Sequence, residues 1–281
     1  MKDIHGATAI VTGASRGIGP YIAKTLAREG AQLALAARDA ARLEETRAAC
    51  EALGVHAIAI ACDVNSTDDL RRLVETAERD QGPIDILVNN AGIEIPGMLT
   101  ELTDAQADDI LETNLRAPIR LTRLVLPGML ARKRGAIVHV SSMAGKSGAP
   151  YNVMYSATKF ALQGFNESMQ FELEDTGVHM GTVCPGFVAD AGMWADRGEK
   201  APRMVSAVSP QKVADGVLKV IRGSLEALVT PAPFRPLLAL NTLFPGLQRP
   251  LVKRMGVAKA MRNAPRAGAA AAPEPEKADV G

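Results

Sequence analysis

The stretch Thr12–Gly19, which reads Thr-Gly-Ala-Ser-Arg-Gly-Ile-Gly, decides the fold of this chain. It follows an apolar run at 7–12, and a helical pattern with Ile18, Ile22 and Leu26 on one face begins inside it. Glycines let a backbone turn tightly and approach a pyrophosphate, while free N–H groups and the positive dipole end at a helix start attract its charge. The stretch therefore predicts a strand, a phosphate-binding turn and a helix.

The glycine spacing in this turn is Gly-x3-Gly-x-Gly, which differs from the Gly-x-Gly-x2-Gly of the general dinucleotide fingerprint. A lone glycine pattern of this kind is equally well a tight turn without a ligand. Its position in the first strand–turn–helix unit favours phosphate binding.

The alternation of short apolar runs with helical segments continues along the chain. We expect strands at 7–12, 31–36, 55–60, 85–88, 136–140, 178–183 and 227–230. Between them lie longer polar segments with helical periodicity, such as 40–53. Strands that alternate with helices of this length predict a parallel sheet with helices on both faces. The predicted fold class is α/β, with a doubly wound sheet of about seven parallel strands.

Composition excludes several classes of protein. The 281 residues are 47% hydrophobic and carry 32 Lys and Arg against 31 Asp and Glu, so no chain-wide basic excess points to nucleic acid. The three cysteines are too few and too far apart for a disulfide framework, which favours a cytoplasmic protein. The four histidines have no metal-binding spacing, so no metal is expected. The first 30 residues lack the uninterrupted apolar run of a secretory signal.

Polar residues follow two of the predicted strands. Asn89-Asn90-Ala91-Gly92 ends the fourth strand, and Ser141-Ser142 ends the fifth. Because open α/β sheets bind ligands at the carboxyl ends of their strands, we expect both sets to face one crevice.

Tyr155 and Lys159 are four residues apart in the predicted helix 154–174, so they share a helix face. A Lys ammonium beside a phenol favours the phenolate and lowers a pKa that is ordinarily near ~10. Tyr155 is therefore a candidate acid/base at neutral pH. The alternative is a packed ring beside a solvated lysine, since Tyr-x3-Lys occurs by chance in many helices.

These motifs, together with Asn114 and Pro185-Gly186, stand in an order and spacing that resemble the short-chain dehydrogenase/reductase family over roughly 5–230. The resemblance implies a single Rossmann-like domain and a nicotinamide-dependent oxidoreductase. Tyr155 would then be the acid/base toward a carbonyl or secondary alcohol, and Lys159 would lower its pKa and hydrogen-bond the nicotinamide ribose. Ser142 would polarise the carbonyl, and Asn114 would hold a water that relays protons, unless it is only a polar residue of a helix.

The cofactor set is drawn from the glycine turn, the strand ends and the resemblance. It comprises Gly13, Ser15, Arg16, Gly17, Ile18, Gly19, Arg38, Asp63, Val64, Asn90, Ala91, Gly92, Tyr155, Lys159, Pro185, Gly186 and Val188. Asp63 would meet the adenine, or else serve as a loop or cap residue. One departure matters, because the family's usual Thr after Pro-Gly is Asp190 here. Nicotinamide anchoring by residue 190 is therefore in doubt, and the Val188 backbone is the safer contact.

Charge argues for NADP(H) as the cofactor. Ala37 stands where an NAD-preferring site usually offers an acidic residue to the ribose, and Arg38 follows it directly. With Arg16 of the glycine turn, two guanidinium groups can pair with a 2′-phosphate. The alternative is that Asp39 turns toward the ribose and favours NAD(H).

The segment after Asp190, which contains Met193, Trp194, Met204 and Val205, resembles the family's substrate lid before a helix that begins at Ser209-Pro210. The predicted substrate set is Ser142, Met143, Tyr151, Tyr155, Met193 and Trp194, with Met98 as a further wall residue. Its apolar members suit an apolar carbonyl or alcohol, although one apolar lid is equally a packing device.

The chain divides into a catalytic domain (1–232), a basic apolar helical extension (233–262) and a disordered tail (263–281). From 227 to 273 there is no Asp or Glu but seven basic residues. Leucine, phenylalanine and methionine recur every three or four residues there, on a helix interrupted near Pro245 and Pro250: Leu237, Leu240, Phe244, Leu247, Leu251 and Met255. This stripe would cap the substrate pocket or pack on a neighbouring subunit; the alternative is peripheral attachment to an anionic membrane.

Other interpretations remain open. The enzyme is either NADP(H)-dependent or an NAD(H)-preferring alcohol dehydrogenase of the same family, and a non-catalytic dinucleotide-binding regulator is disfavoured by the complete Ser142, Tyr155, Lys159 and Asn114 set. A nucleic-acid or flavin binder lacks a motif. Long helices at 108–132 and 154–174 would pair subunits into a homodimer or homotetramer, or pack only on their own sheet. The physiological substrate and the reaction direction cannot be read from the sequence.

Overall fold

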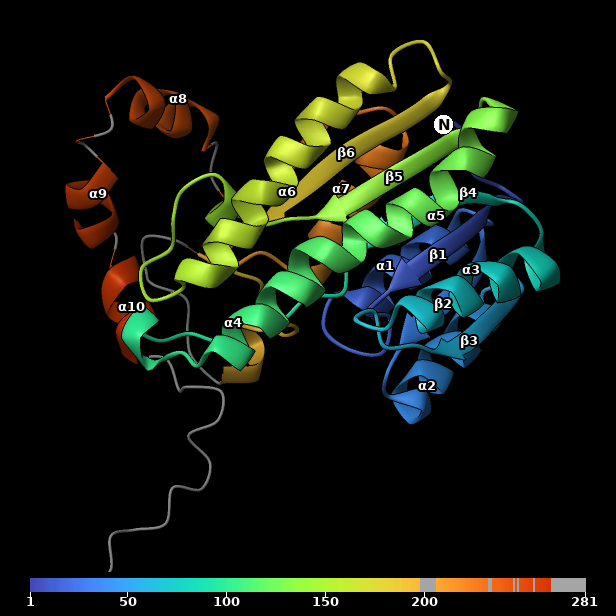
Figure 1. The fold of residues 1–281 in the computed structure, drawn as a ribbon, viewed down its shortest axis with the longest axis horizontal. Helices are drawn as coiled ribbons and strands as arrows, with labels where there is room; N and C mark the ends of the chain where they lie inside the picture. Colours follow the sequence, from blue (N-terminus) through green and yellow to red (C-terminus); the bar gives the residue numbers. More distant parts are fainter. Residues whose placement is uncertain (198–205, 232–233, 245, 247, 255, 264–281) are drawn as a thin grey trace, which may run out of the picture.

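A computed structural model describes residues 1–197, 206–231, 234–244, 246, 248–254 and 256–263. Its core is one sheet of seven parallel strands in the order β3-β2-β1-β4-β5-β6-β7 (Figure 1). The strands are β1 (Thr8–Thr12), β2 (Gln32–Ala37), β3 (Ala57–Ala61), β4 (Ile84–Asn89), β5 (Gly135–Val140), β6 (Val178–Pro185) and β7 (Glu226–Val229). Each bound lies within about two residues of the expected one, and the predicted fold class is confirmed.

Helices cover both faces of the sheet. They are α1 (Gly19–Arg28), α2 (Ala40–Glu51), α3 (Thr67–Gln81), α4 (Asp104–Leu111), α5 (Ala117–Arg132), α6 (Val153–Glu172) and α7 (Pro210–Ile221). Apolar residues of α1, α2 and α7 pack on one face, and those of α3, α5 and α6 on the other. Within β1, Val11 belongs to the first core and Ile10 to the second. This burial on both faces explains why the strands read as continuous apolar runs.

The sheet places a crevice at one end. The strand order reverses beside β1, whose parallel neighbours are β2 and β4. In an open α/β sheet such a reversal opens a crevice at the carboxyl ends of the strands. The glycine turn after β1, the Asn-Asn-Ala-Gly loop after β4 and the serine pair after β5 all begin at this edge.

The stretch 108–132, expected as one helix, is divided in the structure. A π-helical turn (Glu112–Arg116) separates α4 from α5, and Asn114 is fully buried inside it. The Asn114 side chain makes two hydrogen bonds to the backbone of Ile93. A wide turn that turns a side chain toward another segment is typical of π-bulges at functional sites.

Three helices follow β7 and lie apart from the sheet: α8 (Arg235–Leu243), α9 (Gln248–Arg254) and α10 (Val257–Asn263), which we call the cap (Figure 1). Pro250 lies in the first turn of α9, where its missing N–H costs no intrahelical hydrogen bond, so the expected interruption there is not found. Pro245, Leu247 and Met255 lie outside the described residues, as do Met204, Val205 and the tail from 264 on. Among the helices that the structure describes, none is long and apolar enough to cross a membrane.

Candidate active site

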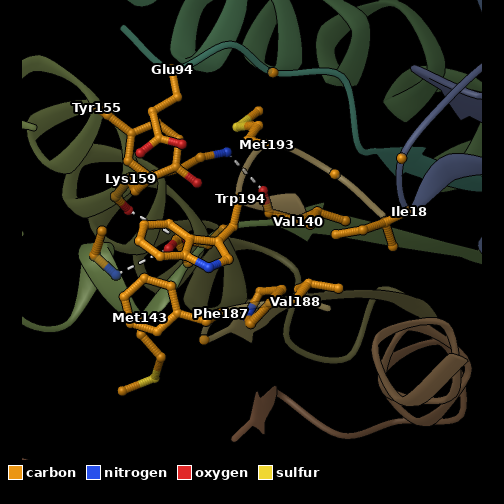
Figure 2. Close-up of a pocket in the computed structure, with 18 of the residues that line it drawn as sticks. Ile18, Glu94, Val140, Met143, Tyr155, Lys159, Phe187, Val188, Met193 and Trp194 are labelled. Atoms are coloured by element: carbon orange, nitrogen blue, oxygen red, sulfur yellow. Dashed lines mark hydrogen bonds between the residues drawn. The ribbon is translucent and has the colours of Figure 1, made fainter. Parts of the chain in front are cut away.

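A cavity of about 650 Å³ opens at the carboxyl ends of the strands. Its lining comes from the glycine turn, the ends of β2 to β6, the start of α6, the segment after β6 and the cap. Nearly all predicted site residues line it, and the exceptions are Gly19, Asn114 and Tyr151. Figure 2 shows the end of the cavity that contains Tyr155 and Lys159.

The glycine turn is fastened to the loop after β4. The Thr12 hydroxyl oxygen accepts hydrogen bonds from the backbone N–H groups of Asn90 (3.0 Å) and Ala91 (3.1 Å). The Asn90 side chain in turn donates to the carbonyl oxygens of Thr12 (2.9 Å) and Gly13 (3.2 Å). Gly13 has φ +64°, and a Cβ there would lie 2.9 Å from the Ala91 Cα. Asn90 therefore holds two loops together.

The start of α1 is available to an anion. A Cβ at Gly19 would lie 2.1 Å from the Gly13 carbonyl oxygen, so this glycine allows close packing of helix on turn rather than lining the cavity. No side chain caps α1, whereas Asp39 caps α2 and Ser66 caps α3. The N–H groups at the start of α1 thus have no capping side chain within the described residues and suit a pyrophosphate.

Three arginines line the far end of the cavity: Arg16 and Arg38, as expected, and Arg42 in the first turn of α2. Sequence reasoning missed Arg42, whose only signal was its place three residues after Asp39. The Asp39 carboxylate accepts from the Arg42 backbone N–H (3.1 Å) and lies 3.6 Å from its guanidinium. Asp39 is therefore engaged at the helix start, which weakens the alternative in which it turns toward a ribose.

Tyr155 and Lys159 come together on α6. The Lys159 ammonium lies 5.4 Å from the centre of the Tyr155 ring and donates to the Val140 carbonyl oxygen (2.9 Å). Lys159 is only 4% exposed, and this burial lowers its pKa to about 8. The cation is thus confined beside the phenol, where its field favours the phenolate.

Ser142 stands at the end of β5 on the same cavity. It begins a short helical turn (Met143–Gly145), and its Oγ accepts from the Ala144 backbone N–H (3.1 Å). A Cβ at Gly145 would lie 2.6 Å from the Lys159 carbonyl oxygen, so the serine loop packs tightly on α6. This close packing fixes Ser142 relative to Tyr155.

Asn114 supports the site from behind the cavity wall. Its Oδ1 accepts from the Ile93 N–H (2.8 Å), and its Nδ2 donates to the Ile93 carbonyl oxygen (2.8 Å). A Cβ at Gly92 would lie 3.2 Å from this amide and 3.7 Å from Lys159 Nζ. Asn114 therefore positions the Gly92 loop close to Lys159; the water that we expected it to hold stays a prediction.

The segment after β6 covers the glycine turn. Val188 forms an isolated β-bridge with Val208. A Cβ at Gly17 would lie 3.2 Å from the Gly192 Cα, so this segment packs closely on the glycine turn. Met193 and Trp194 line the cavity, and the Trp194 ring packs edge-on against Phe187 with centroids 4.5 Å apart (Figure 2). Asp190 is exposed at φ +61° and does not line the cavity, so nicotinamide anchoring by its side chain gains no support.

Of the other residues expected on the substrate side, some line the cavity and some do not. Met143 lines the cavity, but Tyr151, at φ +57°, does not, and neither does Met98, which is 53% exposed. Tyr151 and Met98 are therefore not placed as wall residues. Glu94, which sequence reasoning missed, lines the cavity and accepts a hydrogen bond from the Asn152 side chain.

Asp63 and Val64, which we expected near the adenine, line the cavity. One Asp63 carboxylate oxygen accepts from the Asn65 backbone N–H (3.0 Å), so this residue also stabilises its own turn. The cap contributes a largely apolar wall that includes Leu237 and Met261. Of the expected apolar stripe, only Leu237 is found on the cavity within the described residues, whereas Leu240 and Phe244 are exposed and do not line it.

The sequence is similar to that of a known protein family and of several of its members. Residues 7–202 match the family model described as short chain dehydrogenase. The chain is 43% identical over 234 residues to the ketoacyl reductase HetN of Nostoc sp., covering 83% of this chain and 82% of that protein. It is 36% identical over 251 residues to a putative ketoacyl reductase of Streptomyces coelicolor, covering 83% and 96%.

The structure is also similar to solved structures of short-chain oxidoreductases. A metagenomic short-chain oxidoreductase in complex with NADP superposes with a TM-score of 0.71 at 33% identity, covering 82% of this chain and 99% of that one. A single-residue variant of the actinorhodin polyketide ketoreductase with NADPH superposes with a TM-score of 0.75 at 35% identity, covering 79% and 95%. The chain therefore belongs to the short-chain dehydrogenase family of oxidoreductases.

Proposed function

We propose that this protein transfers hydride between NADP(H) and the carbonyl or secondary alcohol of an apolar substrate. The observation that carries the proposal is the buried Lys159 ammonium beside the Tyr155 ring, in a cavity whose other end carries Arg16, Arg38 and Arg42. Ketoacyl reductases among the relatives support carbonyl reduction. An NAD(H)-preferring alcohol dehydrogenase or a non-catalytic regulator remains the alternative.

The cofactor, when bound, supplies or accepts the hydride. In the reductive direction Tyr155 donates its phenolic proton to the carbonyl oxygen, and Lys159 stabilises the phenolate that remains. Ser142 donates a hydrogen bond to the oxygen as negative charge develops on it. Asn114 acts through the Gly92 loop and keeps it against Lys159.

The preference for NADP(H) follows from charge. Among the described residues, three exposed arginine side chains line one end of the cavity. Asp39, the carboxylate that would favour NAD(H) by binding the ribose, instead caps α2. Arginine pairs with phosphate through forked, charge-assisted hydrogen bonds. The NADP and NADPH complexes among the structural neighbours support this choice.

The test combines a substrate panel with one substitution. Purified protein should oxidise NADPH in the presence of at least one β-keto ester or aliphatic ketone, and kcat/KM should favour NADPH over NADH. Tyr155→Phe should remove turnover and leave NADPH binding nearly unchanged, because the hydroxyl acts mainly in the transition state. Near wild-type turnover by the Phe variant would refute the assignment of the acid/base.

We further propose that the protein is a homo-oligomer. Three apolar side chains of α6 are exposed in the single chain: Val153 (47%), Phe160 (46%) and Phe171 (75%). An exposed apolar helix face of this kind suits a second copy of the chain. Sedimentation velocity should give a dimer or tetramer, and Phe171→Ser should shift it toward monomer.

A peripheral membrane contact is the second proposal for the cap. Leu240, Leu243 and Phe244 are 44%, 73% and 56% exposed on α8 and just after it, and the described charges of the cap are all basic. An apolar surface edged by positive charge suits an anionic bilayer. Truncation after Pro233 should abolish salt-sensitive sedimentation with anionic liposomes; full-length protein that never sediments at low salt would rule it out.

A further inference from the structure

Gln163 lies on the same face of α6 as the proposed catalytic pair, four residues after Lys159 and eight after Tyr155. It does not line the cavity. Its side-chain amide instead hydrogen-bonds to the residue that follows β5 and to two residues of β6. Gln163 is therefore a polar side chain behind the wall of the site, outside the chemistry proposed above.

Every polar atom of the Gln163 amide has a partner. Its Nε2 donates to Ser141 Oγ (2.8 Å) and to Cys184 Sγ (3.0 Å), and its Oε1 accepts from the Thr182 hydroxyl (3.2 Å). Thr182 and Cys184 are two residues apart on β6, so both lie on the face of the strand that meets α6. One side chain thus joins α6, β6 and the end of β5.

Ser141 directly precedes Ser142, for which we propose the hydrogen bond to the substrate carbonyl. Ser141 is 3% exposed, and its hydroxyl accepts from Gln163 and donates to the Lys159 carbonyl oxygen (3.3 Å). Both partners belong to consecutive turns of α6. A shift of the serine pair along that helix would break one of these two bonds, so they fix Ser142 relative to Tyr155.

Packing alone does not call for an amide at this place. On the same face of β6, Met180 belongs to the apolar core under α6. Removing an amide from water costs free energy that its hydrogen bonds recover only in part. A buried polar network in which every member is paired instead specifies one arrangement of the segments it joins. The Gln163 amide is therefore better suited to fixing geometry than to adding stability.

The other end of the serine turn (Met143–Gly145) is held independently. Lys146, the residue after this turn, forms an ion pair with Glu226 at the start of β7, and the two side chains are 27% and 25% exposed. Loss of the Gln163 amide would therefore let Ser142 shift without releasing the turn from the sheet.

From these contacts we infer that Gln163 is a positioning residue for hydride transfer: through Ser141 it holds the Ser142 hydroxyl where Ser142 and Tyr155 can hydrogen-bond to one carbonyl oxygen. This inference rests on the proposed function, from which it takes the roles of Ser142 and Tyr155. It follows that Gln163 should affect the transition state and leave cofactor binding unchanged.

The test compares two glutamines of α6 in the full-length protein. Gln170 lies two turns beyond Gln163 and donates to the Met180 carbonyl oxygen of the same strand (3.0 Å). Gln163→Met and Gln170→Met therefore each remove contacts between α6 and β6, and urea unfolding measures the stability that each loses. The probe is NADPH with the β-keto ester that the wild-type protein reduces fastest.

Gln163→Met should lower kcat about tenfold or more, because a misplacement of about 1 Å can cost about a hundredfold in rate. The KM for NADPH should stay unchanged. Gln170→Met is the matched control and should leave kcat unchanged, even where its loss of stability equals that of Gln163→Met.

Double variants identify the route from Gln163 to the reaction. Ser141→Ala should lower kcat about as much as Gln163→Met, and the two together should lose no more than either alone, because both break one connection. In a Ser142→Ala background kcat is already reduced, and Gln163→Met should lower it no further. Ser141→Ala also tests the connection if Gln163→Met fails to fold.

Three results would overturn the inference: wild-type kcat in Gln163→Met or in Ser141→Ala, the same fall in Gln170→Met, or an undiminished further fall in the Ser142→Ala background. Failure of the proposed function looks different. The wild-type protein would then reduce no β-keto ester, or Ser142→Ala would itself leave kcat unchanged, and the inference would fall together with the proposed roles.

Discussion

Because its ammonium is buried, Lys159, for which we propose a role in turnover, should make the folded protein less stable at neutral pH. Its pKa is about 8 in place of 10.5, chiefly because burial removes the charge from water. Since each pKa unit corresponds to about 1.4 kcal/mol, the charged form costs the folded state about 3 kcal/mol. The hydrogen bond to the Val140 carbonyl oxygen recovers part of this cost.

The pH dependence isolates that cost. Above pH 8 the folded protein loses the Lys159 proton, while the unfolded chain keeps it until about pH 10.5, so folding releases a proton in this window and stability gains as pH rises. Lys159→Met has no such proton. The stability of wild type relative to the Met variant should therefore increase by about 3 kcal/mol between neutral pH and 10.5.

Urea unfolding followed by circular dichroism measures this difference. Both proteins are compared at each pH in a Tyr155→Phe background, because the Tyr155 phenol interacts with Lys159 and would titrate differently in the two. The comparison then cancels the titration of the other groups and any constant loss from the missing hydrogen bond. On its own, Lys159→Met should also lose turnover and bind the cofactor more weakly. Parallel stability curves for the two proteins across the window would refute the reasoning.

Three further changes test other parts of the site. Arg42→Ala should raise the KM for NADPH about tenfold and leave the KM for NADH unaffected, because a charge-assisted hydrogen bond contributes about 1.5–3 kcal/mol. Arg47→Ala, on the same helix but off the cavity, is the control. Equal effects of Arg42→Ala on both cofactors would contradict a role in binding the 2′-phosphate. Gly19→Ala places a methyl group 2.1 Å from the Gly13 carbonyl oxygen, so calorimetry should find NADPH binding lost, and unchanged affinity would contradict the tight packing of helix on turn. Burial lowers the pKa of His139 to about 3, so the folded state resists a proton that the unfolded chain accepts, and stability should fall below pH 6.5. His139→Gln should flatten that fall in urea titrations, and an unaltered acid profile would count against it.

The strands and the place of the site could be predicted because both depend on local signals. A strand buried on two faces is largely apolar, so β1 and β2 appear in the sequence as nearly continuous apolar runs. Parallel strands bring their carboxyl ends to one edge, so the sequence alone was enough to place Asn90 and Ser142 together. The glycine turn followed from its position between a strand and a helix.

The rest depended on contacts between distant segments. At the π-helical turn the Asn114 side-chain amide hydrogen-bonds to the backbone of Ile93, and no periodicity in 108–132 predicts that contact. Arg42 and Glu94 are charged residues without a motif, and they become site residues only when the cavity brings them to its wall. Asp190 stood in a motif position, yet its left-handed backbone turns it to solvent.

The order of the parts along the chain places the cap after all of the proposed chemistry. Every group assigned to proton handling or to the cofactor lies before the end of β7, and the roof over the substrate end follows it. Insertions, deletions or exchange of the segment after β7 would therefore alter one wall of the cavity and leave the proposed catalytic and cofactor residues in place. The same order means that during translation the sheet is complete before the roof is made, so a nascent chain can acquire its nucleotide while the substrate end is still open.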